Sequence, residues 1–139
     1  MPRRNTRLEA EGNDFLVLGQ LLIAGIPAYK AYTNMKGYDL VATNPEANSS
    51  ARISIKSRWR TGAEGFIIKN FECDFVVLVK LNRGPARILP VDYYVMPVAD
   101  VSVLPRSKDW GKVAFSSIRN MERYREQWEP IREFLKGGS

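Results

Sequence analysis

An uninterrupted apolar run, DFVVLVKL from Asp74 to Leu81, constrains the fold of this chain more than any other segment. Its length and its valines are typical of a strand, and a strand that is apolar on both sides has to be covered on both faces. The chain therefore needs a central sheet with a layer of structure on each side. With 139 residues, 45% of them hydrophobic, it can build one domain around such a sheet.

Periodicity and turn residues predict the other elements. We expect a helix over 8–24, because FLVLGQLLIA is apolar on nearly all faces and is followed by Gly25 and Pro27. Residues 59–70 show no clear pattern. The remaining predictions are strands at 27–33, 38–43 and 51–57, a loop at 44–50, strand segments at 87–89 and 92–96, a helical turn at 97–103 and a loop at 106–111.

A last helix is predicted from Ser116 or Ser117 to about residue 136, with a kink at Pro130. It would carry an apolar stripe that either packs on the core or forms a homodimer face, made of Tyr124, Trp128 and Phe134. The element order indicates an α/β or α+β domain, with one mixed sheet flanked by helices. We expect 1–139 to be a single domain, with a flexible basic arm at 1–7 and a flexible tail at 137–139.

The chain contains no histidine and a single cysteine, Cys73, which we expect to be a small buried hydrophobe. These counts exclude Ser-His-Asp and Cys-His nucleophile systems and the usual zinc sites. Any general base or metal ligand must come from Asp, Glu, Lys, Tyr or the backbone. Oxygen ligands favour Mg²⁺ or Mn²⁺.

The net charge of +6 indicates a polyanionic partner such as nucleic acid. Basic residues cluster around the central strands, in an N-terminal arm and near the C-terminus: Arg52, Lys56, Arg58, Arg60 and Lys69; Arg3, Arg4 and Arg7; Arg119, Arg123, Arg125 and Arg132. No apolar run reaches membrane-spanning length and the N-terminus lacks the apolar segment of a secretory signal, so we expect a cytoplasmic protein.

Two short segments suggest a reaction centre: GYDLVA at 37–42 and ARISIKSR at 51–58. In the second, Ile53 and Ile55 alternate with polar residues, which predicts a strand with one buried face. If the two strands are adjacent, Asp39, Ser54 and Lys56 come together. A carboxylate beside a lysine suits metal-assisted attack on a phosphodiester.

With these segments the chain resembles the PD-(D/E)XK nuclease superfamily, and most of all its small uncharacterised bacterial and phage members. The resemblance covers roughly 12–97 and rests on the order of four segments: GNDFLVLGQLLIAG, GYDLVA, ARISIKSRW, and CDFVVLVKLNRG followed by YYVMP. It implies a restriction-endonuclease-like fold and hydrolysis of DNA with Mg²⁺ or Mn²⁺.

The resemblance also implies roles for single residues. Asp39 and the Ile55 carbonyl would bind the metal, and Lys56 would orient the attacking water and stabilise the transition state. Ser54 stands where the family usually has Glu, Asp or Gln, so it is either a weak ligand or a relic at a dead site. Asp14 on the first helix could complete the metal shell, with Glu11 as a weaker candidate.

Each of these residues also has a purely structural interpretation. Asp39 could accept backbone hydrogen bonds in a turn, Lys56 could be a solvated strand lysine, and Asp14 could be a helix cap or first-turn acid. Trp59 suits a core or lid position better than stacking on a base. The cations Arg52, Arg58, Arg60 and Lys69 would bind the phosphate backbone or simply form a solvated face.

Three functions follow, in decreasing order of preference. The first is a metal-dependent nuclease acting on DNA. The second is an inactive member of the same fold that binds nucleic acid. The third is a protein-interaction module, such as an immunity or accessory protein, in which the fold has no catalytic role.

Overall fold

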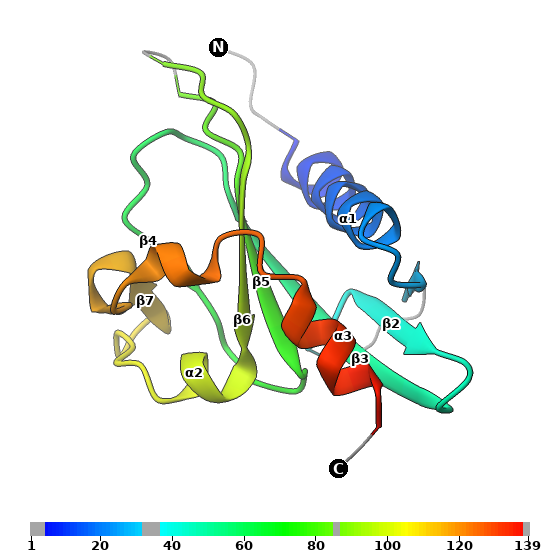
Figure 1. The fold of residues 1–139 in the computed structure, drawn as a ribbon. Coiled ribbons are helices and arrows are strands. Elements are labelled where there is room, and N and C mark those ends of the chain that lie inside the picture. The colour runs from blue at the N-terminus through cyan, green and yellow to red at the C-terminus, as the bar shows by residue number, and fades with distance from the viewer. Residues whose placement is uncertain (1–4, 32–36, 85–86, 138–139) are drawn as a thin grey trace.

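The structure is a computed structural model that describes residues 5–31, 37–84 and 87–137. Its centre is a five-stranded sheet in the order β1-β2-β3-β5-β6 (Figure 1). The β3 and β5 strands run parallel and the other neighbours antiparallel, so the sheet is mixed as predicted. Its strands are β1 (Ala28–Lys30), β2 (Leu40–Asn44), β3 (Ser49–Arg58), β5 (Phe75–Lys80) and β6 (Asp92–Pro97).

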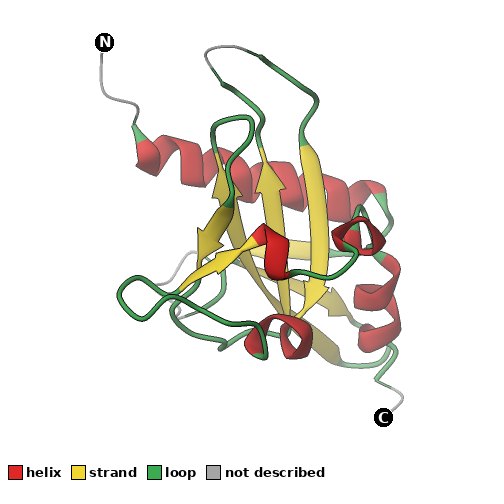
Figure 2. Cartoon of the chain, turned by 90° about the vertical axis from the view of Figure 1, so that its left-hand side faces the viewer, coloured by secondary structure: helices red, strands yellow, loops and turns green. Residues whose placement is uncertain are grey.

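Each face of the sheet is covered by its own layer. The helices α1 (Thr6–Ile23) and α3 (Glu129–Leu135) lie on one face. The other face carries the small ribbon of β4 (Gly65–Ile67) and β7 (Lys112–Ala114), together with the short helix α2 (Val98–Ser102). Two 3₁₀ turns, η1 (Phe115–Ser117) and η2 (Met121–Tyr124), complete that layer, which faces the viewer in Figure 2. The α+β architecture is thus confirmed.

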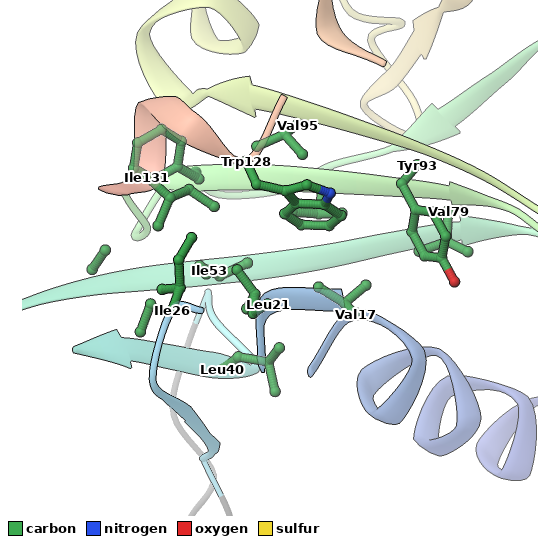
Figure 3. Packing of buried hydrophobic residues seen from close by; sticks show 14 of the residues in the cluster. Val17, Leu21, Ile26, Leu40, Ile53, Val79, Tyr93, Val95, Trp128 and Ile131 are labelled. Carbon is green, nitrogen blue, oxygen red and sulfur yellow. The ribbon is translucent and has the colours of Figure 1, made fainter. Parts of the chain in front are cut away.

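The central strand β5 is buried on both sides, as its apolar run predicts. Val77 and Val79 belong to the core under α1 and α3, which also contains Val17, Leu21 and Trp128 (Figure 3). Val76 and Leu78 point the other way, into a second core under the small ribbon. These alternating side chains show why the strand has no polar face.

The first helix forms where it was predicted. Asn5 caps α1, because its side chain accepts hydrogen bonds from the backbone N–H groups of Arg7 and Leu8. Gly25, with φ of 82°, follows the helix and reverses the chain. The predicted basic arm is therefore wrong for residues 5–7, which begin the helix, whereas 1–4 and 138–139 lie outside the described residues.

The strands flanking the predicted loops differ in length from the expectation. β1 covers only part of 27–33, and residues 32–33 lie outside the described residues. The predicted loop 44–50 is shorter, because β2 runs to Asn44 and β3 begins at Ser49. Asn48, with φ of 52°, makes the tight reversal. Strand pairing here overrides the low strand propensity of the polar residues.

The predicted C-terminal helix over 116–136 is wrong. Asn120 and Glu126 have φ of 48° and 50°, and these left-handed residues divide the segment into η1, η2 and α3. Pro130 lies in the first turn of α3 and causes no kink. The N–H groups of a first turn make no hydrogen bond within the helix, so the missing N–H of proline costs nothing there.

The aromatic stripe is lost with that helix. Tyr124 is buried in the second core and Trp128 in the first, so they do not share a face and cannot form a dimer surface. Phe134 is partly exposed and stands edge-on to Phe75, with ring centroids 5.5 Å apart. Trp59 packs against the first core and Cys73 is buried in the second, as predicted.

The small ribbon was not predicted. It uses Gly65 for close approach, because a Cβ at that position would lie 2.3 Å from the Val113 carbonyl oxygen. The predicted strand at 87–89 is absent: residue Ile88 makes only an isolated bridge to Arg83. Within the described part of the chain, no helix has the length and apolar character needed to cross a membrane.

Candidate active site

Asp39 ends the ladder between β2 and β3. Its backbone N–H donates to the Ile53 carbonyl at 2.8 Å, and its carboxylate Oδ2 accepts the Ile55 N–H at 2.7 Å. The Asp39 side chain thus accepts the hydrogen bond that a backbone carbonyl would accept if the strand pairing continued. This contact fixes the carboxylate at the end of the paired region. The turn interpretation of Asp39, in which it accepts a backbone hydrogen bond, is consistent with this contact.

The backbone of Ile55 faces the same place. Residues of a strand direct their N–H and C=O groups alternately toward the two neighbouring strands. The carbonyls of Arg52 and Arg58 accept hydrogen bonds on the β5 side, from Asp74 and Leu81. Ile55 is two residues from Ile53, whose carbonyl accepts the Asp39 N–H, so the Ile55 carbonyl is also directed toward the Asp39 side.

A cluster of charges surrounds this point, which we call the acidic cluster: the carboxylates of Glu11, Asp14 and Asp39 and the ammonium group of Lys30. Lys30, at the end of β1, forms ion pairs with Glu11 and with Asp14, the latter at 3.4 Å. Its side chain is only 9% exposed and its ammonium group lies 5.3 Å from the centre of the Phe15 ring. The hydrogen bond to Glu11 raises the pKa of Lys30.

Burial and a second carboxylate both change the pKa of Asp14. Burial is the main cause that raises its pKa to about 6, followed by repulsion from Asp39, while Lys30 acts in the opposite direction. The Asp14 side chain is 16% exposed. Because α1 begins at Thr6, Asp14 lies in the helix interior, so its interpretation as a cap or first-turn acid is wrong. The structure therefore brings Asp14 and Asp39 together.

Ser54 and Lys56 alternate along β3 with Ile53, which is buried in the first core, and Ile55, which packs against it. Ser54 pairs in register with Val76 of the second core and is only 4% exposed. Lys56 is half-buried and interacts electrostatically with the thiol of Cys73, whose pKa is raised mainly by burial. Among the described residues, no hydrogen bond or ion pair joins Lys56 to Asp39. The cation in contact with the acids is Lys30.

The predicted phosphate-binding cations are not equivalent. Arg52 is tied to Asp74, whose Oδ2 accepts its backbone N–H at 2.8 Å and lies 3.4 Å from its Nε. Arg58 is half-buried and pairs in register with Lys80 of β5. Arg60 and Lys69 are exposed.

Sequence reasoning missed Lys30. Glu11 and Asp14 could be recognised because residues three apart share a helix face. Lys30 follows a turn and belongs to a strand of only three residues, in which no alternation is visible. Its position beside the helix depends on how β1 pairs with β2, and the sequence pattern carries no sign of that pairing.

The oxygen donors present suit a hard cation. Two carboxylates that interact electrostatically, together with a backbone carbonyl, are of the donor type through which Mg²⁺ commonly binds while it keeps several waters. The described residues contain no group of three or more His, Cys, Asp or Glu side chains placed to hold a metal ion. Among the described side chains of the cluster, ionised carboxylates outnumber the ammonium group of Lys30.

The sheet and its layers define a nuclease-like fold. Among solved structures, the chain is similar to a bacterial homing endonuclease, I-Ssp6803I, with a TM-score of 0.61 and 19% sequence identity over 94% of each chain. At this identity the similarity shows the fold. No protein-family model and no curated protein matches the chain.

Proposed function

We propose that this protein is a metal-dependent nuclease that hydrolyses DNA phosphodiester bonds, and that it belongs to the PD-(D/E)XK superfamily. The observation that carries the proposal is the position of Asp14 near Asp39 at the end of the β2–β3 ladder, where burial first and repulsion from Asp39 second raise the pKa of Asp14 to about 6. The similarity of fold to a homing endonuclease supports the choice of DNA as substrate.

Each residue of the site has a proposed role. Asp39, Asp14 and the Ile55 carbonyl would hold Mg²⁺ or Mn²⁺, which when bound supplies Lewis acidity and a more acidic water. The Ile55 N–H keeps Asp39 in position, so little reorganisation is needed. Lys56 is the proposed cation for the developing charge on the phosphate. The DNA backbone would be held by Arg52, Arg58, Arg60 and Lys69.

Plasmid cleavage tests the proposal. Wild-type protein should nick or degrade plasmid DNA with Mg²⁺ or Mn²⁺, and Asp39→Asn should lower the rate by about 10² or more because the site loses a charged ligand. Asparagine still accepts the Ile55 N–H, so circular dichroism should show an unchanged fold. Lys56→Ala should also lower the rate. Wild-type cleavage no faster than that of these variants with either ion would overturn the proposal.

The buried Ser54 favours a second function, nucleic-acid binding without catalysis. A neutral hydroxyl that is 4% exposed is a poor substitute for the carboxylate usual at this position. In this case the protein should bind DNA with an affinity that falls linearly in a plot of log K against log salt concentration, and should not cleave it. Fluorescence anisotropy across a salt series, run on the preparations used for the plasmid assay, separates the two functions.

A further inference from the structure

The outward face of α1 is apolar, although a helix that covers a sheet ordinarily presents polar residues to solvent. Val17 and Leu21 mark the inner face, which packs on the first core. Residues three, four and seven apart share the opposite face, which we call the α1 stripe: Leu8, Gly12, Phe15, Leu16, Gly19, Leu22 and Ile23. Its large side chains are between 38% and 83% exposed, and α1 lies at the edge of the molecule in Figure 1. A continuous exposed apolar face of this kind is typical of a protein–protein contact.

Two glycines lie in the α1 stripe without a reason inside the described molecule. Apart from proline, glycine is the least favourable residue in the interior of a helix. A Cβ built at Gly65 or Gly111 would collide with a backbone carbonyl oxygen, so those glycines are needed by the fold. Among the described residues, no atom lies within 4 Å of a Cβ built at Gly12 or Gly19. A glycine on an open helix face allows another backbone to approach closely.

The residues of the α1 stripe read nearly the same in both directions. The centre lies between Phe15 and Leu16, one glycine follows at equal distance on either side, and Leu8 and Ile23 close the two ends. If two identical helices pack antiparallel about a two-fold axis at this centre, each glycine meets a glycine and Leu8 meets Ile23. A two-fold interface requires a surface that is complementary to itself in this manner. We propose that the α1 stripe is the interface of a homodimer, in which α1 packs antiparallel to α1 of a second copy.

The charges beside the stripe favour the antiparallel direction. Glu9 and Glu11 flank the stripe in the N-terminal half of α1, whereas residues 15–23 carry no charge. A parallel pair would bring the glutamates of the two copies together, and like charges repel. An antiparallel pair sets them opposite uncharged residues. It also places the positive N-terminal end of each helix dipole beside the negative C-terminal end of the other.

The area of the α1 stripe suits a reversible dimer. A large apolar side chain buries roughly 100 Å² of surface, so the stripes of two copies together would bury on the order of 1,000 Å². Leu16 also borders a groove lined by Ile88, which adds apolar surface beside the stripe. This total is near the lower limit for specific interfaces, and a dissociation constant in the micromolar range follows. Asp14 is on the inner face of α1, so the inference does not rest on the proposed function.

Sedimentation velocity of the full chain, over concentrations that span the micromolar range, tests the dimer. The wild type should pass from monomer to dimer as its concentration rises. Gly19→Gln places a long side chain where the two backbones approach, and should raise the dissociation constant at least about tenfold. The same substitution improves helix propensity, so thermal unfolding of the monomer should not be weakened. A loss of the dimer through unfolding is thereby distinguished from a loss of the interface.

Ile23→Gln and Val103→Gln form a matched pair. Both residues are aliphatic and about equally exposed, at 83% and 80%, but only Ile23 belongs to the α1 stripe. Ile23→Gln should weaken the dimer several-fold, whereas Val103→Gln should leave the dissociation constant unchanged.

Disulfide cross-linking in a Cys73→Ala background tests the direction of packing. Leu16 lies beside the two-fold axis, so Leu16→Cys should cross-link to itself under mild oxidation. Leu8 and its copy would be about 20 Å apart in an antiparallel pair, so Leu8→Cys alone should not cross-link. A mixture of Leu8→Cys and Ile23→Cys proteins should do so.

Three results would overturn the inference: a wild type that stays monomeric throughout the micromolar range, a dimer that Gly19→Gln and Ile23→Gln leave intact, or cross-linking of Leu8→Cys with itself. None of them bears on DNA cleavage, which the plasmid assay tests separately.

Discussion

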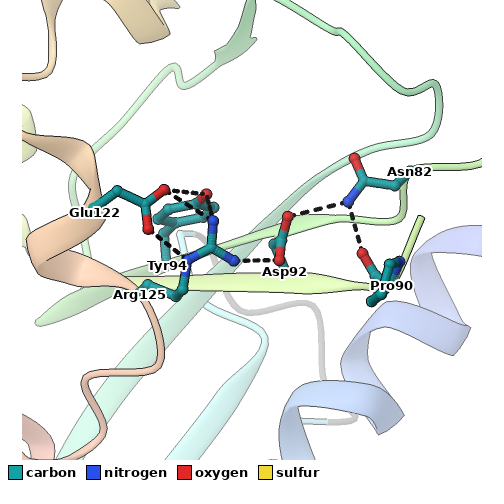
Figure 4. A network of polar contacts seen from close by, with 6 residues as sticks. All are labelled: Asn82, Pro90, Asp92, Tyr94, Glu122 and Arg125. Carbon is teal, nitrogen blue, oxygen red and sulfur yellow. Dashed lines mark hydrogen bonds and ion pairs between the residues drawn. The ribbon is translucent and has the colours of Figure 1, made fainter.

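The molecule holds two networks of charged side chains, and they differ in balance. In the acidic cluster, as far as the chain is described, Glu11 and Asp14 both pair with the Lys30 ammonium group, and Asp39 repels Asp14. In the second, which we call the Arg125 network, the Arg125 guanidinium donates to Asp92, Glu122 and the Tyr94 hydroxyl (Figure 4). Lys80 interacts electrostatically with the same groups, so two cations meet two carboxylates.

The Arg125 network is satisfied throughout. The hydrogen bond from Arg125 lowers the pKa of Glu122, and the hydrogen bond to Glu122 raises the pKa of Arg125. Asn82 donates to Asp92 and to the Pro90 carbonyl, which extends the network to the β5–β6 connection. These contacts join β6 to the segment after η2 and have a structural purpose.

The charges of the acidic cluster, by comparison, are not balanced. Asp14 has a raised pKa because burial and Asp39 oppose its ionised form more than Lys30 supports it. Unbalanced and partly buried charge of this kind is typical of sites that bind a ligand, whereas balanced networks are typical of structure. The comparison predicts that matched substitutions in the two networks will have opposite effects on activity and stability.

The largest expected contrast is between Asp39→Asn and Asp92→Asn. Each removes one carboxylate charge and keeps an amide oxygen as acceptor. DNA cleavage should fall by about 10² or more in Asp39→Asn and should change by less than about twofold per folded molecule in Asp92→Asn. Equal losses in initial-rate measurements would remove the distinction between the two networks.

The pH dependence of stability should come from Asp14. Its pKa rises from 3.8 to about 6 on folding, so the folded state binds the proton more tightly. The resulting stabilisation is fully present below pH 3.8 and is lost as pH rises through about 6, up to about 3 kcal/mol in all. Urea unfolding should be measured at about pH 4.5 and about pH 7.5, on either side of this pKa. The free energy of unfolding should differ less between the two pH values in Asp14→Asn than in the wild type. An identical difference would contradict the assignment.

Arg125→Met should destabilise the protein by about 1–2 kcal/mol, because Asp92 and the Tyr94 hydroxyl lose their charged donor. Cleavage per folded molecule should not change. Arg119→Met is the control: Arg119 is exposed, and its substitution should alter the free energy of unfolding by less than about 0.5 kcal/mol. Urea titrations of the three proteins measure these differences.

The smallest effects are expected at the cations proposed to bind phosphate. Arg60 is exposed, whereas Arg52 is already paired with Asp74. Arg60→Gln should weaken DNA binding several-fold, by roughly one phosphate contact, and reduce the salt slope by about 1. Arg52→Gln should have a smaller effect on the slope. Anisotropy titrations at several salt concentrations would detect a reversed order.

Local patterns predicted most of the sheet and much less of the C-terminal third. The strand β5 and the helix α1 were predictable because their side-chain periods are set within a few residues of chain. The C-terminal segment has an equally good helical period, but Tyr124 and Trp128 pack into different cores. Packing therefore forces left-handed conformations at Asn120 and Glu126, which no helical pattern can show.

The sequence alone determined the polar residues available for chemistry: carboxylates and lysines without histidine, on a first helix and on strands of which only the third showed its alternation in advance. Only the tertiary structure decided which of them meet. It placed Lys30, which no pattern singled out, in ion pairs with Glu11 and Asp14. The physical reason is that periodicity is a local property of the chain, whereas the balance of charge in a buried site depends on distances between segments that only folding brings together.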